Sequence, residues 1–172
     1  MAINFPEGTQ DLPARVIQVV SDTTDTHQTS LAGDTWHTCP NLSVSITPVS
    51  GSSKILLIAQ ISWWINSGNE MLHRFRRTIG STDSTIGVGS GTNIQGTSFD
   101  SQESGASWKV NTSPLMYLDS PATTSATTYT VQSQCQGPGT GAIVWFNRSY
   151  NTTGTDSAAA QSTLTAMEII QP

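Results

Sequence analysis

The longest hydrophobic run in the chain is Lys54–Asn66, which reads KILLIAQISWWIN and whose only polar residues between its ends are Gln60 and Ser62. Its isoleucines and two adjacent tryptophans favour a β-strand over a helix. At ~3.3 Å per residue, an extended run of this length crosses a small domain from edge to edge. It is shorter than the ~18–20 apolar residues of a membrane-spanning helix. We therefore predict that it is the central strand of an all-β domain.

Shorter runs with alternating or β-branched apolar residues predict further strands, each bounded by Gly, Pro, Asn or Ser. Leu42–Thr47 shows the clearest alternation and, with the VSGSS turn that follows, predicts an antiparallel hairpin with Ile55–Ile65. The polar segments Asp22–Asp34 and Ser90–Ala106 predict loops. The other predicted strands lie in or near Arg15–Ser21, Trp36–Cys39, Met71–Ile79, Ser84–Gly89, Leu115–Leu118, Tyr129–Ser133, Ala142–Phe146 and Leu164–Ile170.

This even series of short strands predicts a β-sandwich of two sheets or a jelly roll, with Greek-key variants left open. The 172 residues fit one domain that can bury a sizeable core. Residues 1–14 contain two prolines and a glycine without any apolar period. They predict an extended N-terminal arm ahead of a single β-sandwich domain at residues 15–172.

Composition narrows the function classes. The formal net charge is −5, which argues against a nucleic-acid partner because such binding depends on Lys and Arg that neutralise phosphates. Ser and Thr make up more than a quarter of the chain, so its polarity comes from hydroxyls, which suit exposed sheet faces. The N-terminal residues lack the basic and apolar regions of a signal peptide, and we expect no membrane partner. Cys39 and Cys135 allow one disulfide or none, and two unpaired thiols are the favoured reading.

The sequence contains no convincing catalytic, metal or cofactor motif. His27, His37 and His73 lie in separate segments, and serines are so abundant that a Ser/His coincidence has no weight. The acidic residues of the two polar segments have no apolar surroundings that would raise a carboxyl pKa. We therefore expect no enzyme activity, no cofactor and no bound metal.

Two groups of residues are candidates for a subunit interface. The period of two along a strand places Trp63, with Ile61, and Trp64 on opposite faces, so we expect one tryptophan in the core and the other exposed as an interface anchor. Arg74 and Arg76 share the outer face of another strand. Pairing with local acids is the favoured reading for them, and a cationic patch that meets an acidic neighbour or sister subunit is the alternative.

Four segments in this order, INFPEGTQDLPARVIQVV, LSVSITPVSGSSKILLI, YLDSPATTSATTYTVQ and STLTAMEI, resemble small virion structural proteins of tailed bacteriophages, of the kind found in marine phages and cyanophages. The resemblance extends from Ile3 to Ile170 and is weakest at Ser90–Ala106. It implies a jelly roll like that of tumour necrosis factor, assembled as a homotrimer, and it carries no catalytic residues.

The resemblance implies a capsid decoration, or cement, protein that binds the major capsid protein on the outer surface of the virion, after assembly in the cytoplasm of the bacterial host. The arm would contact the capsid or a neighbouring subunit through Ile3, Phe5, Pro6, Leu12 and Pro13. The alternative is a tail-fibre tip that recognises a host surface glycan through the loop at residues 90–107, Trp108 and Tyr117. The sequence leaves head or tail location, copy number and host open.

Overall fold

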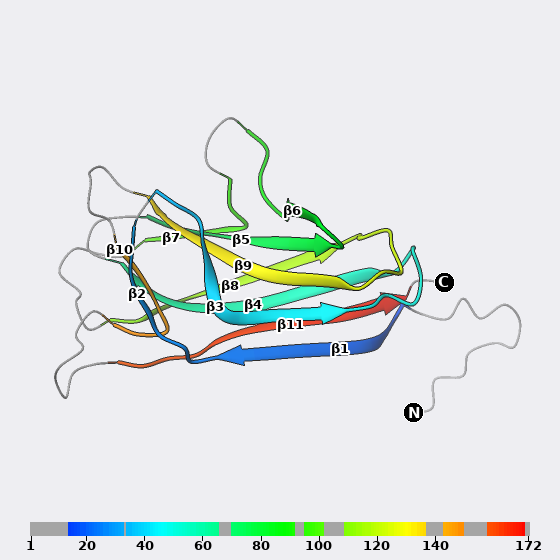
Figure 1. Cartoon of the computed structure of the whole chain (residues 1–172), viewed down its shortest axis with the longest axis horizontal. Helices are drawn as coiled ribbons and strands as arrows, with labels where there is room; N and C mark the ends of the chain where they lie inside the picture. The colour runs from blue at the N-terminus through cyan, green and yellow to red at the C-terminus, as the bar shows by residue number, and fades with distance from the viewer. Residues whose placement is uncertain are drawn as a thin grey trace, which may run out of the picture.

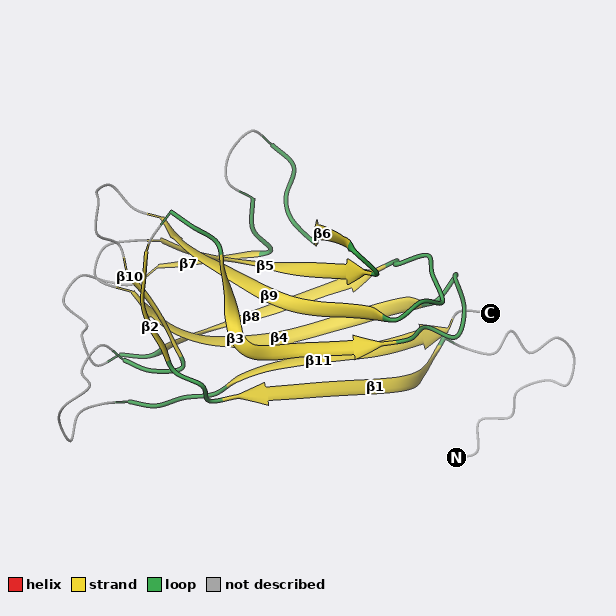
Figure 2. Cartoon of the chain, in the orientation of Figure 1, coloured by secondary structure: helices red, strands yellow, loops and turns green. Residues whose placement is uncertain are grey.

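The computed structural model describes residues 14–32, 34–65, 70–91, 95–101, 109–136, 143–149 and 158–170. This part of the chain contains β-strands and no helix (Figure 2). Within it there is accordingly no helix with the length and apolarity to span a membrane. The strands are β1 (Arg15–Thr24), β2 (Gln28–Ala32), β3 (His37–Ile46), β4 (Lys54–Ile65), β5 (Glu70–Ile79), β6 (Thr82–Ile86), β7 (Ser98–Ser101), β8 (Asn111–Asp119), β9 (Thr127–Gln136), β10 (Ile143–Phe146) and β11 (Ser162–Ile170).

The strands form two antiparallel sheets, which face each other as a sandwich and overlap in the view of Figure 1. We call them sheet A, which contains β4, and sheet B, which contains β5. In sheet A, β4 pairs with β8 on one side, and with β11 and then β10 on the other. β1 and β2 pair with β11 and β10 and complete that edge. In sheet B the order is β3, β9 and β5, with β6 and β7 pairing successive parts of β5.

In three cases two strands that follow each other in the sequence occupy the place of a single strand in the jelly roll: β1 with β2, β6 with β7, and β10 with β11. The eleven strands therefore fill eight strand positions. In chain order, positions 1, 8, 3 and 6 form sheet A and positions 2, 7, 4 and 5 form sheet B. This arrangement of two Greek keys is the jelly roll. The predicted all-β jelly-roll sandwich is therefore confirmed, and the predicted arm lies outside the described residues.

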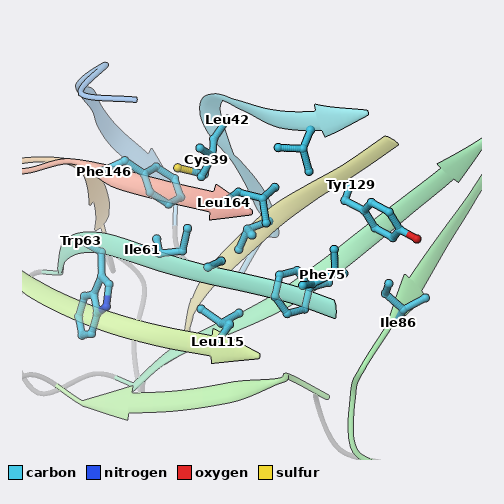
Figure 3. Close-up of a cluster of buried hydrophobic side chains, with 14 of the residues drawn as sticks. Cys39, Leu42, Ile61, Trp63, Phe75, Ile86, Leu115, Tyr129, Phe146 and Leu164 are labelled. Atoms are coloured by element: carbon cyan, nitrogen blue, oxygen red, sulfur yellow. The ribbon is translucent and has the colours of Figure 1, made fainter. Parts of the chain in front are cut away.

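The hydrophobic core fills the space between the two sheets (Figure 3). Alternate side chains of β4 point inward, and Ile55, Leu57 and Ile61 are fully buried. From sheet B, Phe75 and Tyr129 meet them in the core. The prediction that Lys54–Asn66 is the central strand of the domain is confirmed, since β4 has paired neighbours on both sides.

The predicted hairpin between Leu42–Thr47 and Ile55–Ile65 is wrong. β3 pairs with β9 in sheet B, whereas β4 pairs with β8, β10 and β11 in sheet A. The connection between them crosses from one sheet to the other, so that Val44 and Leu57 approach the same core from opposite sides. Alternating patterns identify the buried face of each strand but do not say which strand lies beside it.

Three local boundaries also differ from the sequence-based expectation. The predicted loop at Asp22–Asp34 contains the end of β1 and all of β2, and the predicted loop at Ser90–Ala106 contains β7. Pro40, expected to end a strand, lies within β3, where the register shifts between Thr38 and Ser43 and Asn41 adopts a φ of 51°. A bulge at this point accommodates the proline, which has no N–H for the ladder.

Candidate interaction surface

The outer face of sheet A is unusually apolar. The residues of β4 that alternate with its core side chains include Leu56 and Ile58, which point away from the sandwich. Outward apolar side chains of β1, β8 and β11 surround them. We call the whole group the apolar patch, and its members are Val16, Val19, Leu56, Ile58, Met116, Leu118, Met167 and Ile169.

Strand register makes the apolar patch continuous. Val19 pairs with Met167 and Met167 pairs with Leu56. Leu56 in turn pairs with Leu118, which completes a row across four strands. Directly paired side chains on one face lie ~4.5–5.5 Å apart, so each member of the row contacts the next. The row therefore runs without interruption from one edge of sheet A to the other.

The members of the apolar patch at the two edges of the sheet are the most exposed. Met116 and Leu118 on β8 are 68% and 48% exposed, and Val19 on β1 is 56% exposed. Lys54, whose Nζ donates to Ser120 Oγ at 2.7 Å, is the charged side chain among the outward residues that pair across these strands. Exposed apolar side chains in a contiguous group with few charges are typical of a surface that contacts a protein.

The outer face of sheet B has the opposite character. Ser43 pairs with Thr130, which pairs with Arg76, and Ser45 pairs with Thr128, which pairs with Thr78. These rows contain hydroxyl and charged groups where the corresponding rows of sheet A contain apolar side chains. The two sheets therefore present chemically distinct surfaces on opposite sides of one sandwich.

Trp63 and Trp64 do point to opposite faces of β4, but neither is exposed. Trp63 is fully buried and donates from Nε1 to Ser113 Oγ at 2.7 Å. Trp64 is 4% exposed and packs edge to face on Trp145, over which the guanidinium of Arg148 lies at 5.1 Å. The expectation of one exposed tryptophan is therefore wrong, and the reason for placing either at a trimer interface no longer holds. The outer face of β4 is therefore covered near its C-terminal end, where Trp64 packs on Trp145, and exposed toward its N-terminal end, where Ile58 lies.

Arg74 and Arg76 make local contacts on sheet B. Arg76 donates hydrogen bonds to Asp83 and to Thr85, and the bond to Asp83 lowers the pKa of the Asp83 carboxyl. Arg74 donates twice to Gln132 Oε1, at 2.7 and 3.0 Å, and its guanidinium lies 3.8 Å above the ring of Trp36. Burial lowers the pKa of the Arg74 guanidinium, and the positive charge of the nearby Arg76 lowers it further. Pairing with a local acid is thus confirmed for Arg76, whereas Arg74 has an amide and an aromatic ring as partners.

The most buried ion pair joins the two sheets and was not expected from the sequence. Arg77 Nη1 on β5 binds both carboxylate oxygens of Asp119 on β8, at 2.9 and 3.1 Å. Tyr129 on β9 donates its hydroxyl to the same carboxylate at 2.8 Å. Burial, and then the hydrogen bond to Asp119, raise the pKa of Tyr129. The sequence pattern did not indicate that Arg77 would find its partner on β8.

A serine and a histidine do come together, inside the core. His73 Nδ1 lies 2.7 Å from Ser133 Oγ, and both residues are fully buried. Burial lowers the pKa of His73 to about 3. A serine nucleophile must be reached by its substrate, and this pair is closed off between the sheets and beside the ring of Trp63. The described residues contain no cluster of three His, Cys, Asp or Glu side chains that would suit a metal ion.

The remaining candidates are placed as follows. Tyr117, expected to contact a glycan in the alternative reading, is half-buried and packs beneath Gly87, so its ring is partly unavailable. Trp108, residues 92–94 and 102–107 of the loop at 90–107, and the arm residues Ile3, Phe5, Pro6, Leu12 and Pro13 lie outside the described residues. Cys39 and Cys135 are buried, unpaired thiols, as expected, and burial raises the pKa of each to about 12.

No protein-family model and no curated protein matches the sequence. Among solved structures, the chain is similar to two of infectious bursal disease virus, of the Gx strain (10% identity, TM-score 0.42) and the Gt strain (11% identity, TM-score 0.43). It is also similar to the VP2 subviral particle of the same virus (12% identity, TM-score 0.39). These matches cover 98%, 100% and 100% of this chain but only 42%, 47% and 47% of theirs. The chain thus spans less than half the length of these proteins, and at such TM-scores we draw no functional argument from the likeness.

Proposed function

We propose that this protein is a structural component of a tailed-phage virion, a homotrimeric decoration protein that binds the major capsid protein on the outside of the head and stabilises the shell. The observation that supports it best is the pair of contrasting faces. Sheet A presents the apolar patch, which suits permanent contact with protein, and sheet B presents a hydroxyl-rich face, which suits water.

The jelly roll and the sequence resemblance support the same proposal. Eight-stranded jelly rolls are common in viral coat proteins and in lectins, so the fold is compatible with both the decoration role and the glycan-binding alternative. The resemblance to virion proteins of tailed phages favours the decoration role. The shell contact is assigned to the arm, with Ile3, Phe5, Pro6, Leu12 and Pro13 as its contact residues. Three arms per trimer would add their modest affinities through multivalency.

Antibody labelling of virions tests where on the particle the protein is located. Gold-labelled antibodies against the purified protein should decorate the heads of particles at many positions. Labelling confined to the tail tip would overturn the decoration role in favour of the glycan-binding alternative. Particles that carry no label would overturn the virion proposal altogether.

A binding experiment tests the arm. The full chain and a variant that lacks residues 1–13 are each mixed with heads prepared without this protein, and bound protein is measured after sedimentation. The full chain should sediment with the heads, and the truncated chain should lose at least ~10-fold in affinity. Equal binding of the two proteins would contradict the assignment of the shell contact to the arm. Circular dichroism of the truncated chain verifies that its β-sandwich is folded.

A further inference from the structure

We propose that the apolar patch is the surface through which copies of this chain associate with one another. The inference rests on the proposed homotrimer and names the face that holds it together. It replaces Trp63 and Trp64, which are buried within one subunit, by the outward side chains of β1, β4, β8 and β11.

The size of the patch suits a subunit contact. Its eight positions, each about 4.8 Å wide across the strands and about 7 Å long between rows, give a footprint of roughly 270 Å². A standard interface buries ~800 Å² on each partner, with an apolar centre and a polar rim. The apolar patch therefore supplies about a third of such an interface. Ser21, Thr163 and Thr165, which flank it on β1 and β11, supply part of the rim.

The chemistry of the patch favours a permanent partner. Homo-oligomer interfaces are more apolar than transient ones and are depleted in charged residues at their centre, where methionine is enriched. The apolar patch contains Met116 and Met167 and no charged side chain, and Lys54 lies at its border. An exposed surface of this kind on a free monomer would expose it to non-specific association.

Electrostatics favours another copy of the chain at this face. Each copy carries a formal charge of −5, so two copies repel one another wherever their acidic surfaces meet. None of the outward residues that pair across β1, β11, β4 and β8 is acidic. On sheet B, in contrast, the carboxylate of Asp83 is exposed. Electrostatic repulsion between two copies is therefore weaker when they meet through sheet A than when they meet through sheet B.

Charge substitution in the patch tests the inference. The double variant Val19→Lys/Met116→Lys places two cations on strongly exposed positions of β1 and β8, where the fold tolerates them because the side chains face water in the single chain. The matched control, Ser43→Lys/Ser45→Lys, adds the same charge to exposed positions of sheet B. A conservative variant, Met116→Leu, keeps the patch apolar.

The molar mass in solution is measured by light scattering over a range of protein concentrations. The wild type, the sheet B control and Met116→Leu should each show three times the 18.3 kDa mass of the chain. Val19→Lys/Met116→Lys should dissociate to monomers, with a dissociation constant raised at least ~10-fold. Circular dichroism must show the same β content in all four proteins. A monomeric wild type, or a trimer that survives the patch variant and dissociates in the sheet B control, would overturn the inference.

The head-binding experiment separates this inference from the proposed function. A wild type that associates through the patch but does not bind heads supports the inference and contradicts the decoration role. A wild type that is monomeric and binds heads, and that loses this binding with Val19→Lys/Met116→Lys, shows that the patch meets the shell. That result overturns the inference and leaves the decoration role intact.

Discussion

Arg77 and Asp119 form an ion pair that ties sheet B to sheet A, with Arg77 Nη1 at 2.9 and 3.1 Å from the two carboxylate oxygens. Asp119 is 3% exposed, and Tyr129 donates to the same carboxylate. Removal of one partner from such a pair leaves the other charge without compensation in a poorly solvated place. The geometry of this cluster leads to the first prediction.

We predict that Asp119→Ala lowers the free energy of unfolding by ~3–5 kcal/mol, because it leaves Arg77 unpaired and the Tyr129 hydroxyl without an acceptor. Tyr129→Phe removes one hydrogen bond and should cost ~1–2 kcal/mol. Urea unfolding followed by tryptophan fluorescence measures both. Asp83→Ala, which removes the acid of a surface pair, is the control and should cost less than ~1 kcal/mol. Similar losses for Asp119→Ala and Asp83→Ala would contradict the structural role of the buried pair.

We predict that stability falls as the pH is lowered below 6.5. The pKa of His73 is about 3 in the folded protein and near 6.5 in the unfolded chain. Between these values the unfolded chain binds a proton that the folded chain does not. The free energy of unfolding therefore decreases toward low pH by up to ~1.4 kcal/mol per pH unit for this group. Urea unfolding between pH 6.5 and 5 measures this slope before most carboxylates titrate.

Substitution of single histidines tests which group causes this pH dependence of the free energy of unfolding. His73→Leu should flatten the slope, whatever the variant does to the stability at neutral pH. His27→Gln, a substitution at an exposed histidine, is the matched control. A slope that persists in His73→Leu would show that another group titrates, and it would contradict the assignment to His73.

Glycine substitutions separate backbone strain from steric overlap. Gly87 has a φ of +65°, and an added Cβ would lie 2.7 Å from the ring of Tyr117, whereas Gly80 has a φ of +58° and open space around it. Gly80→Ala should cost ~1 kcal/mol for the left-handed conformation alone. Gly87→Ala should cost ~1–3 kcal/mol more, because Tyr117 must move. Gly51→Ala, with neither feature, is the control, and thermal unfolding ranks the three. Equal losses at Gly80 and Gly87 would show that the Tyr117 ring yields freely.

The two cysteines should be inert in the folded protein. Cys39 and Cys135 are buried and unpaired, and burial raises the pKa of each thiol to about 12, so very little reactive thiolate is present at neutral pH. A thiol-specific chromogenic reagent should react at the rate of unfolding and label both thiols in denaturant. A melting temperature that drops on addition of a reducing agent would instead reveal a disulfide.

Local sequence pattern predicted much of the fold. The alternation in Leu42–Thr47 predicted a strand with one apolar face, and Leu42, Val44 and Ile46 are buried, because a strand turns successive side chains to opposite faces whatever its partners are. The strand at Met71–Ile79 and its division into two faces were also predicted correctly. These features depend only on residues that are close in the sequence.

The candidate surface was predicted only in part. Lys54–Asn66 has apolar residues on both of its faces, and on the outer face Leu56 is half-buried and Ile58 is exposed. The sequence did not indicate that Met116, Leu118 and Val19 would join them. Those residues lie about 40–60 positions away along the chain, and only the strand register brings them into one row.

The sequence by itself determined most of the strands and, where apolar and polar residues alternate, which side chains share a face, because these follow from local conformational preference and a period of two. Only the tertiary structure decided that β3 and β4 lie in different sheets, that Trp64 is covered, and that Arg77 meets Asp119. Strand pairing is made by backbone hydrogen bonds, which are nearly the same for every residue. The choice among partners is therefore settled by packing of the whole core, and it is this choice that gathers the apolar patch on one face.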